Sequence, residues 1–425
     1  METIINPDRS IWAELLKRPL LDTTSLNESV GLVLDEIRQK GDEAVKKYTG
    51  HFDNVELENS CVSEEEIVEA ESLVSDSLKD AIKSAAENIE IFHKAQLQEV
   101  KKVETVSGVL CWQKSVAIEK VGLYIPGGSA PLFSTVLMLA VPAKIAGCKE
   151  IVLCSPPNKE GKLHPAILYA ASLAGVKKIF KIGGVQAVGA MAIGTESVPK
   201  VNKIFGPGNQ FVMAAKQLVS IADVAIDMPA GPSEVAVMAD NTAVPAFVAA
   251  DLLSQAEHGP DSQVVLVTNT KELIAEVEKE LEIQLANLSR RSIAEKALAN
   301  SRTIVLDSQE EMVDLINEYA PEHLIISMGN YAEVAERITN AGSVFLGNYT
   351  PESAGDYASG TNHTLPTNGW ANAYSGVNLD SFMKKITFQE ITPEGIQSLG
   401  PVIEKMAEAE LLEAHKNAAT LRMKK

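Results

Sequence analysis

From Val121 onwards, short apolar segments alternate with segments of helical length. The first series comprises VGLYIPG, EIVLCSP, KKIFKIGG, KIFGPG and VAIDMP; the second comprises EVAVMAD, QVVLVTN, RTIVLD, HLIISM and SVFLG. Strands separated by single helices pair in parallel, because the chain must cross back over the sheet. The sequence therefore predicts two doubly wound α/β units, and we expect their ligands at the carboxyl ends of the strands.

The region before these series has a different pattern. Residues 1–20 are predicted to form a small N-terminal arm, and residues 21–120 are predicted to be mostly helical. Ser63 and Glu66 have the spacing of a capping box, in which the hydroxyl and the carboxylate satisfy free amides at a helix start. A helix is expected to run from there towards Phe92.

The region after the second series begins with an aperiodic segment. Residues 349–378 are rich in Gly, Ser, Thr and Asn, and a loop of this length is typical of a functional segment. Thr392 is a plausible helix cap, and residues 401–421 form an amphipathic run. The chain is thus expected to end in a helical tail.

Composition limits the class of protein. The 425 residues are enough for about two to four domains, and a net charge of -19 argues against nucleic acid or an anionic membrane as the main partner. The four cysteines lack the spacing of a disulfide framework or a C-x-x-C site. Neither a signal peptide nor a membrane-spanning run is evident, so the protein is expected to be cytoplasmic.

Two histidines have neighbours suited to chemistry. Gln255 and His258 are spaced i,i+3 in the last turn of a helix that Gly259-Pro260 ends, so both could offer a lone pair to one metal ion. Alternatively, His258 is simply favoured at a helix C-terminus by the dipole. Glu322 and His323 lie just before a strand. The histidine could act as a general base and the carboxylate could activate water, or the two could form an ordinary satisfied polar pair.

Other candidates are weaker when taken alone. Asp356 and His363 lie in the long polar loop, and Glu410 and His415 lie near the C-terminus; each could be a solvated surface group. The glycine-rich turns hold Tyr124, Gln186 and Asn209, and their backbone amides could approach phosphates. They contain neither the G-x-G-x-x-G fingerprint nor a P-loop, so ordinary strand-to-helix connections remain an alternative.

The order of these motifs resembles one family. GLYIPGG, FGPGN, DMPAGPSEV, LLSQAEHGPDSQ, YAPEHL, AGDYASGTNHTLPT and AHKNAATLR look like successive signatures of histidinol dehydrogenases, from about residue 120 to residue 421. The resemblance implies oxidation of L-histidinol to L-histidine with two molecules of NAD and one Zn²⁺ per subunit. Such a zinc ion would act as a template and Lewis acid, because it has no redox chemistry.

The resemblance also implies roles for individual residues. Glu322 and His323 match the acid–base pair. The zinc ligands implied are Gln255, His258, Asp356 and His415. The substrate contacts implied are Ser233, Gln255, His258, Glu322, His323, Asp356, His363, Glu410 and His415. The NAD contacts implied are Tyr124, Gln186 and Asn209.

The implied architecture is a homodimer of chains with two incomplete Rossmann-like sheets. Residues 121–232 would form the NAD-contacting domain, and residues 21–120 together with 233–378 would form the zinc and catalytic domain. The tail of residues 379–425 would cross to the partner, so that Glu410 and His415 complete the neighbouring site.

Three alternatives stay open at the level of sequence. The same scaffold could oxidise another alcohol; a zinc hydrolase could use Glu322 and metal-bound water; a non-enzymatic α/β assembly protein would leave the polar loops unexplained. A thiohemiacetal route through Cys111 or Cys154 is disfavoured, because neither cysteine has an adjacent base in the sequence.

Overall fold

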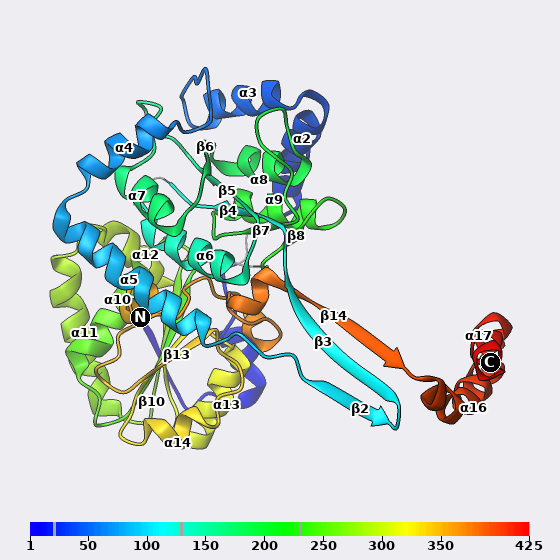
Figure 1. Ribbon diagram of the computed structural model, residues 1–425. Helices are drawn as coiled ribbons and strands as arrows, with labels where there is room; N and C mark the ends of the chain where they lie inside the picture. Colours follow the sequence, from blue (N-terminus) through cyan, green and yellow to red (C-terminus); the bar gives the residue numbers. More distant parts are fainter. Residues whose placement is uncertain (20–22, 128–130, 230, 425) are drawn as a thin grey trace.

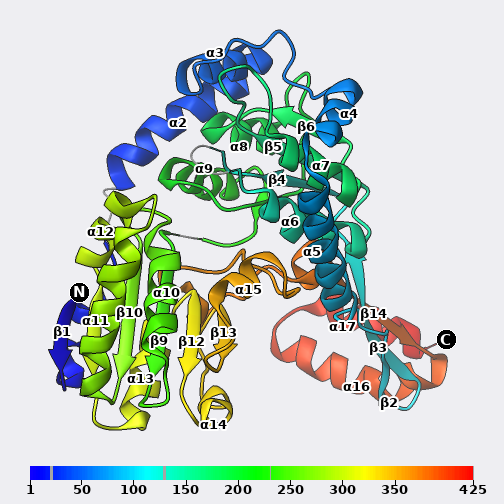
Figure 2. The ribbon, with the colours of Figure 1, turned by 90° about the vertical axis from the view of Figure 1, so that its left-hand side faces the viewer.

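The computed structural model describes residues 1–19, 23–127, 131–229 and 231–424. It contains two parallel sheets, one above the other in Figure 2, and a third, antiparallel sheet that extends from the body. Both predicted series of strands are confirmed, and the chain has the predicted α/β fold class. Parts of two predicted motifs, residues 128–130 and Ala230, lie outside the described residues.

The first series forms the five-stranded sheet B, in the order β6-β5-β4-β7-β8. All its neighbouring strands are parallel. Its strands are β4 (Lys120–Tyr124), β5 (Glu150–Ser155), β6 (Lys178–Lys181), β7 (Lys203–Phe205) and β8 (Ala225–Ile226). Its connecting helices are α6 (Phe133–Ala146), α7 (Pro165–Ala174), α8 (Gly184–Ile193) and α9 (Gln210–Ser220).

The second series forms the six-stranded parallel sheet A, in the order β1-β11-β10-β9-β12-β13. Its strands are β9 (Glu234–Ala239), β10 (Gln263–Thr268), β11 (Arg302–Val305), β12 (His323–Ser327) and β13 (Ser343–Leu346), with β1 (Glu2–Ile5) added beside β11. Its helices are α10 (Pro245–Ala256), α11 (Lys271–Ala286), α12 (Arg291–Ala299), α13 (Gln309–Tyr319) and α14 (Tyr331–Ala335). Apart from β1, the strand order repeats that of sheet B, with the first strand of each series in the middle.

The N-terminal helices cover sheet B. They are α2 (Thr23–Lys40), α3 (Asp42–Phe52), α4 (Glu64–Leu73) and α5 (Asp76–Lys94). Their buried apolar side chains, such as Ile37 and Ile89, belong to the two core clusters on the faces of sheet B. Residues 23–94 therefore pack with the segment 121–229, because the apolar faces of helices α2 to α5 pack against helices α6 to α9 (Figures 1 and 2). The prediction from sequence differs, since it groups residues 21–120 with sheet A.

Two details of this region refine the sequence analysis. The capping box of Ser63 and Glu66 is confirmed. The single helix expected to follow it is two helices, because the chain is extended at Val74 and Ser75 then caps α5. Residues 21–120 also end in strands rather than helix, β2 (Lys102–Val106) and β3 (Val109–Ala117).

The C-terminal tail starts with a strand. β14 (Met383–Ile391) pairs antiparallel with β3, and β3 pairs with β2, which together make sheet C. Thr392 then caps α16 (Pro393–Ala409), as predicted, and α17 (Glu413–Met423) packs on α16. Figure 1 shows this pair of helices at the far end of the extended ribbon. Among the described residues, no helix combines the length and apolar character that crossing a membrane requires.

Candidate active site

The predicted catalytic residues meet at the amino edge of sheet A. His323 begins β12, Glu322 precedes it, and Gln255 lies in the last turn of α10, which enters β10. Crossover helices run antiparallel to the strands, so their C-termini arrive at the amino edge. The predicted catalytic residues of sheet A therefore lie at the opposite edge from the carboxyl ends, where the sequence predicts ligands. Asp356 joins them from the short helix α15 (Glu352–Tyr357), which lies between the two sheets in Figure 2.

His323 is at the centre of this group. Its side chain is buried, and its Nδ1 is 2.9 Å from Gln255 Nε2. The other ring nitrogen, Nε2, is 3.4 Å from Asp356 Oδ1. Glu322 places its Oε2 3.6 Å from His323 Nδ1, and the same oxygen accepts a hydrogen bond from the backbone N–H of Glu234 at 3.0 Å. The acid–base pair predicted from sequence is thus held in one buried network.

A second network, which was not predicted from the sequence, supports Glu322 through Glu234. The carboxylate of Glu234 is buried and forms an ion pair with Arg18 Nε at 2.6 Å. Arg18 also donates to the backbone carbonyl of Tyr319 at 2.6 Å and lies over its ring. The N-terminal arm therefore fixes the start of β9 beside Glu322. The available signal was the glutamate at the head of an otherwise apolar strand.

The site has donor atoms that fit a divalent metal. Gln255 Oε1 and His323 Nε2 are buried and have no hydrogen-bond partner among the described residues. His323, Glu352 and Asp356 each offer a ligand atom, and these atoms lie within 4.8 Å of one another. Nitrogen and oxygen donors suit Zn²⁺. The residues present in this chain therefore fit a zinc ion, with the unpaired buried oxygen of Gln255 available to it.

Electrostatics favour a cation at the same place. Burial opposes the charged form of His323, but Glu352, Glu322 and Asp356 outweigh it and raise the pKa of His323 well above its usual value. Burial raises the pKa of Glu352. For Asp356 burial is outweighed by His323, His363 and His258, so its pKa is lowered. A bound metal ion would neutralise these carboxylates and so remove the cause that raises the pKa of His323.

The remaining predicted residues of this edge lie close by. His258 is exposed just beyond α10, where its charge acts on Asp356. His363 is 2.8 Å from the backbone carbonyl of Asp356 through Nδ1 and 3.1 Å from Thr135 Oγ1 through Nε2. Because Thr135 belongs to α6, His363 connects the site to the helices that pack on sheet B. Ser233 is half-buried immediately before β9.

Comparison with known proteins identifies the family. The family model described as histidinol dehydrogenase matches residues 16–423. A histidinol dehydrogenase of Bacteroides thetaiotaomicron is 66% identical over 423 residues, covering 100% of this chain and 99% of the relative, and that of Escherichia coli K12 is 53% identical over 413 residues, covering 96% and 94%. A crystal structure of histidinol dehydrogenase from Elizabethkingia anophelis has a TM-score of 0.98 and 57% identity, covering 100% and 98% of the two chains.

The chain belongs to the histidinol dehydrogenase family. It is accordingly an NAD-dependent oxidoreductase. The family match extends to the N-terminal helices, which lie before the segment that carried the sequence resemblance.

The residues predicted to contact NAD lie at the carboxyl edge of sheet B. Tyr124 ends β4, and its buried hydroxyl accepts a hydrogen bond from Gly184 N at 3.1 Å. Gln186, in the first turn of α8, is buried and donates through Nε2 to Asp53 Oδ2 at 3.0 Å; its Oε1 has no partner among the described residues. Asn209 caps α9 with its side-chain oxygen. Asp53 was missed, because it comes from the end of α3, far away in sequence.

The turn before Asn209 depends on glycine. Gly206 has φ of +124°, and a Cβ there would lie 2.0 Å from the carbonyl oxygen of Tyr124. The buried Lys216 secures this turn, since it donates to Gly206 O at 2.8 Å and pairs with Asp227. The close approach of β7 to β4 therefore requires the glycine that the FGPGN motif supplies.

Two predicted residues are not brought into this site by the single chain. Glu410 is the C-cap of α16, and His415 lies in α17; both side chains are exposed. Helices α16 and α17 lie beyond the end of β14, away from the two parallel sheets (Figure 1). Within one chain, the predicted ligand set is therefore Gln255, His258 and Asp356 without the fourth member.

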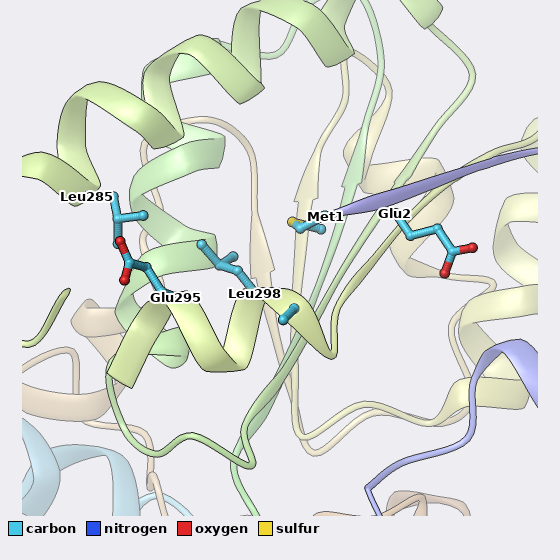
Figure 3. A pocket seen from close by; sticks show the side chains of 6 residues that line it. Met1, Glu2, Leu285, Glu295 and Leu298 are labelled. Carbon is cyan, nitrogen blue, oxygen red and sulfur yellow. The ribbon is translucent and has the colours of Figure 1, made fainter. Parts of the chain in front are cut away.

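Two other features do not belong to this site. A surface hollow of about 360 Å³, shown in Figure 3, is lined by Met1, Glu2, Leu285, Glu295, Leu298 and Ala299. This lining shares no residue with the predicted site.

Cys154 is completely buried in β5, and burial raises the pKa of its thiol. Such a thiol stays protonated, which argues against a nucleophilic role.

Proposed function

We propose that this chain oxidises L-histidinol to L-histidine through histidinal, with one Zn²⁺ per subunit and two molecules of NAD. Family membership supports a dehydrogenase of this class. The observation that carries the proposal is the buried convergence of Gln255, Glu322, His323 and Asp356 at one edge of sheet A.

Gln255, His258 and Asp356 would hold the zinc ion, together with His415 from a second copy of the chain. Zinc would act as a Lewis acid and template for the substrate, and NAD would accept hydride. The unpaired oxygen of Gln255 supports this ligand set from inside the chain. The exposed position of His258 leaves it free to turn towards a bound ion.

His323 would take the hydroxyl proton of the substrate in the first oxidation. Its buried Nε2 has no hydrogen-bond partner among the described residues, although Asp356 Oδ1 lies 3.4 Å away, so this ring nitrogen is left to accept the proton. The carboxylate of Glu322, beside Nδ1, would stabilise the protonated ring. In the second stage Glu322 would activate the water that adds to the aldehyde, and the N–H of Glu234 keeps that carboxylate aimed.

The other matched residues would bind the two organic ligands. Ser233, His363 and Glu410 would contact histidinol, and Tyr124, Gln186 and Asn209 would contact NAD. The hydrogen bond between His363 and Thr135 supports an arrangement in which the histidinol and NAD residues lie near each other, because it joins the sheet A site to α6. Holding the aldehyde between the amino edge of sheet A and the carboxyl edge of sheet B would limit its loss to water.

The active form would be a homodimer in which residues 379–425 cross to the partner. The tail exposes large apolar side chains that require a surface to cover them: Val402, Met406, Leu411, Leu412 and Leu421. Each subunit would then supply Glu410 and His415 to the other. Residues 121–232 would be the NAD-contacting part, and residues 233–378 the zinc part. The cytoplasmic location stays a prediction.

The test is the stoichiometry of NADH formed per L-histidinol consumed, measured by near-ultraviolet absorbance with and without a chelator. Two NADH per substrate, lost on chelation and restored by Zn²⁺, are expected. NADH from another alcohol but not from histidinol would assign the scaffold to a different substrate. Zinc-dependent hydrolysis without NADH would replace the proposal with the hydrolase alternative.

A further inference from the structure

Glu352 is a buried carboxylate inside the site that has no assigned role in the proposed chemistry. It is the first residue of α15, and its side chain is fully buried. Its Oε1 accepts a hydrogen bond from Gln255 Nε2 at 2.6 Å, and its Oε2 accepts one from Ser254 Oγ at 3.3 Å. Both oxygens of Glu352 thus face the last turn of α10, which carries Gln255.

The amide of Gln255 has two chemically different ends. The oxygen can bind a metal ion, but the nitrogen cannot, because its lone pair is delocalised into the amide. With Glu352 ionised, as a bound cation beside it would favour, an amide turned over would put its oxygen 2.6 Å from the carboxylate oxygen, and two acceptors would face each other. The observed orientation instead leaves Oε1 of Gln255 buried and unpartnered among the described residues.

We propose that Glu352 is a positioning residue that fixes the orientation of the Gln255 amide and so presents its oxygen to the metal ion. This rests on the proposed function, in which Gln255 is a zinc ligand. Partners that orient metal ligands in this way commonly change metal affinity about 10- to 100-fold when they are removed. Gln255 Nε2 also lies 2.9 Å from His323 Nδ1, but that ring nitrogen accepts the amide N–H in only one tautomer, whereas the ionised Glu352 carboxylate is always an acceptor.

A competing role for Glu352 is direct binding of the metal, since it lies with His323 and Asp356 in a group of closely spaced ligand atoms. Direct binding would require the carboxylate charge. Positioning requires only an acceptor for the Gln255 N–H. The two roles therefore differ in what a glutamine at position 352 should do.

The experiment measures the rate at which zinc passes from the zinc-loaded, substrate-free protein to an excess of a chromophoric chelator. Glu352→Met removes the acceptor and is expected to speed zinc loss about 10- to 100-fold. Glu352→Gln keeps an acceptor of the same shape, so its rate should stay within about threefold of the wild type. Circular dichroism and the thermal midpoint check that each variant folds; if Glu352→Met does not fold, Glu352→Gln and the background below still decide.

A Gln255→Met background separates positioning from ligation. There is no amide to orient in this variant, so adding Glu352→Gln or Glu352→Met should leave its zinc loss unchanged within about twofold. Full zinc loss in Glu352→Gln, or a further loss in the Gln255→Met background, would overturn positioning in favour of direct binding. Wild-type zinc retention in Glu352→Met would also overturn it. Wild-type retention in Gln255→Met would instead show that the proposed ligand set has failed.

Discussion

Apart from β1, sheets A and B have the same strand order, but their predicted site residues lie at opposite edges. In sheet B, Tyr124 and Gln186 follow the ends of parallel strands, which is the usual place for ligands in doubly wound folds. In sheet A, His323 begins its strand and Gln255 ends the helix that precedes one. The difference shows that strand order alone does not determine which edge of a sheet becomes a site.

The two edges also differ in their electrostatics. The edge of sheet A gathers Glu322, Glu352 and Asp356 around one histidine, and an ion pair between Arg18 and Glu234 supports it. At the edge of sheet B, Asp53 is held by the Gln186 amide, and Asp227 is paired with the buried Lys216. We therefore expect a metal ion at the first edge and a dinucleotide at the second. Variants at each edge should affect one ligand and spare the other.

The largest effect is expected for His323→Asn, at the edge of sheet A. Removing a general base typically costs about 10²- to 10⁴-fold, so turnover should fall about a thousandfold. Bound zinc, measured by metal analysis, should remain, because His323 is not among the proposed ligands. A variant that turns over at near-normal rates would exclude His323 as the base, and one that loses its zinc would place it in the metal shell.

A smaller effect is expected for Gln186→Leu, at the edge of sheet B. The loss of one buried amide, about 1 to 1.5 kcal/mol, should raise the KM for NAD about tenfold. Zinc content and the KM for histidinol should stay as in the wild type. The comparison would break down if the KM for histidinol rose while the KM for NAD did not change.

The smallest effect is expected for Asp53→Asn, and it concerns stability. Burial raises the pKa of Asp53 from 3.8 to about 6, so this group contributes stability below pH about 4 that is lost as the pH rises through about 6. Asparagine does not ionise, so the variant does not lose this stability. The free energy of unfolding of the variant, minus that of the wild type, should therefore increase as the pH rises. The gain should be well below about 3 kcal/mol, because the carboxylate is partly exposed. Urea unfolding at pH 5 and pH 7.5 measures it; a gain that shrinks with pH would contradict the assignment.

The parallel sheets were predictable because their signal is local. Each buried strand, such as EVAVMA, is a continuous apolar run followed by a helix, and both series of strands were confirmed. Sheet C was not predicted, because β14 pairs with β3 across more than two hundred residues of sequence and most of its side chains are exposed. The short strand β1 was missed for a similar reason, since it only adds to the edge of a sheet formed elsewhere.

The site could be predicted only in part. Gln255, Glu322, His323 and Asp356 were found as candidates, and the structure brings them together. Arg18 and Asp53 act through partners at least 133 positions away, and no local pattern marks such pairs. Glu410 and His415 remain untested, because their proposed partners belong to a second chain.

The central claim is that the amino edge of sheet A holds the metal through the oxygen of Gln255. A zinc-edge anomalous difference map of the crystallised, zinc-loaded protein tests it directly. The account predicts one peak per site about 2.0 to 2.2 Å from Gln255 Oε1 and Asp356, with Glu352 hydrogen-bonded to the amide nitrogen. A peak bound by Glu352 and His323, with Gln255 outside the coordination sphere, would contradict it.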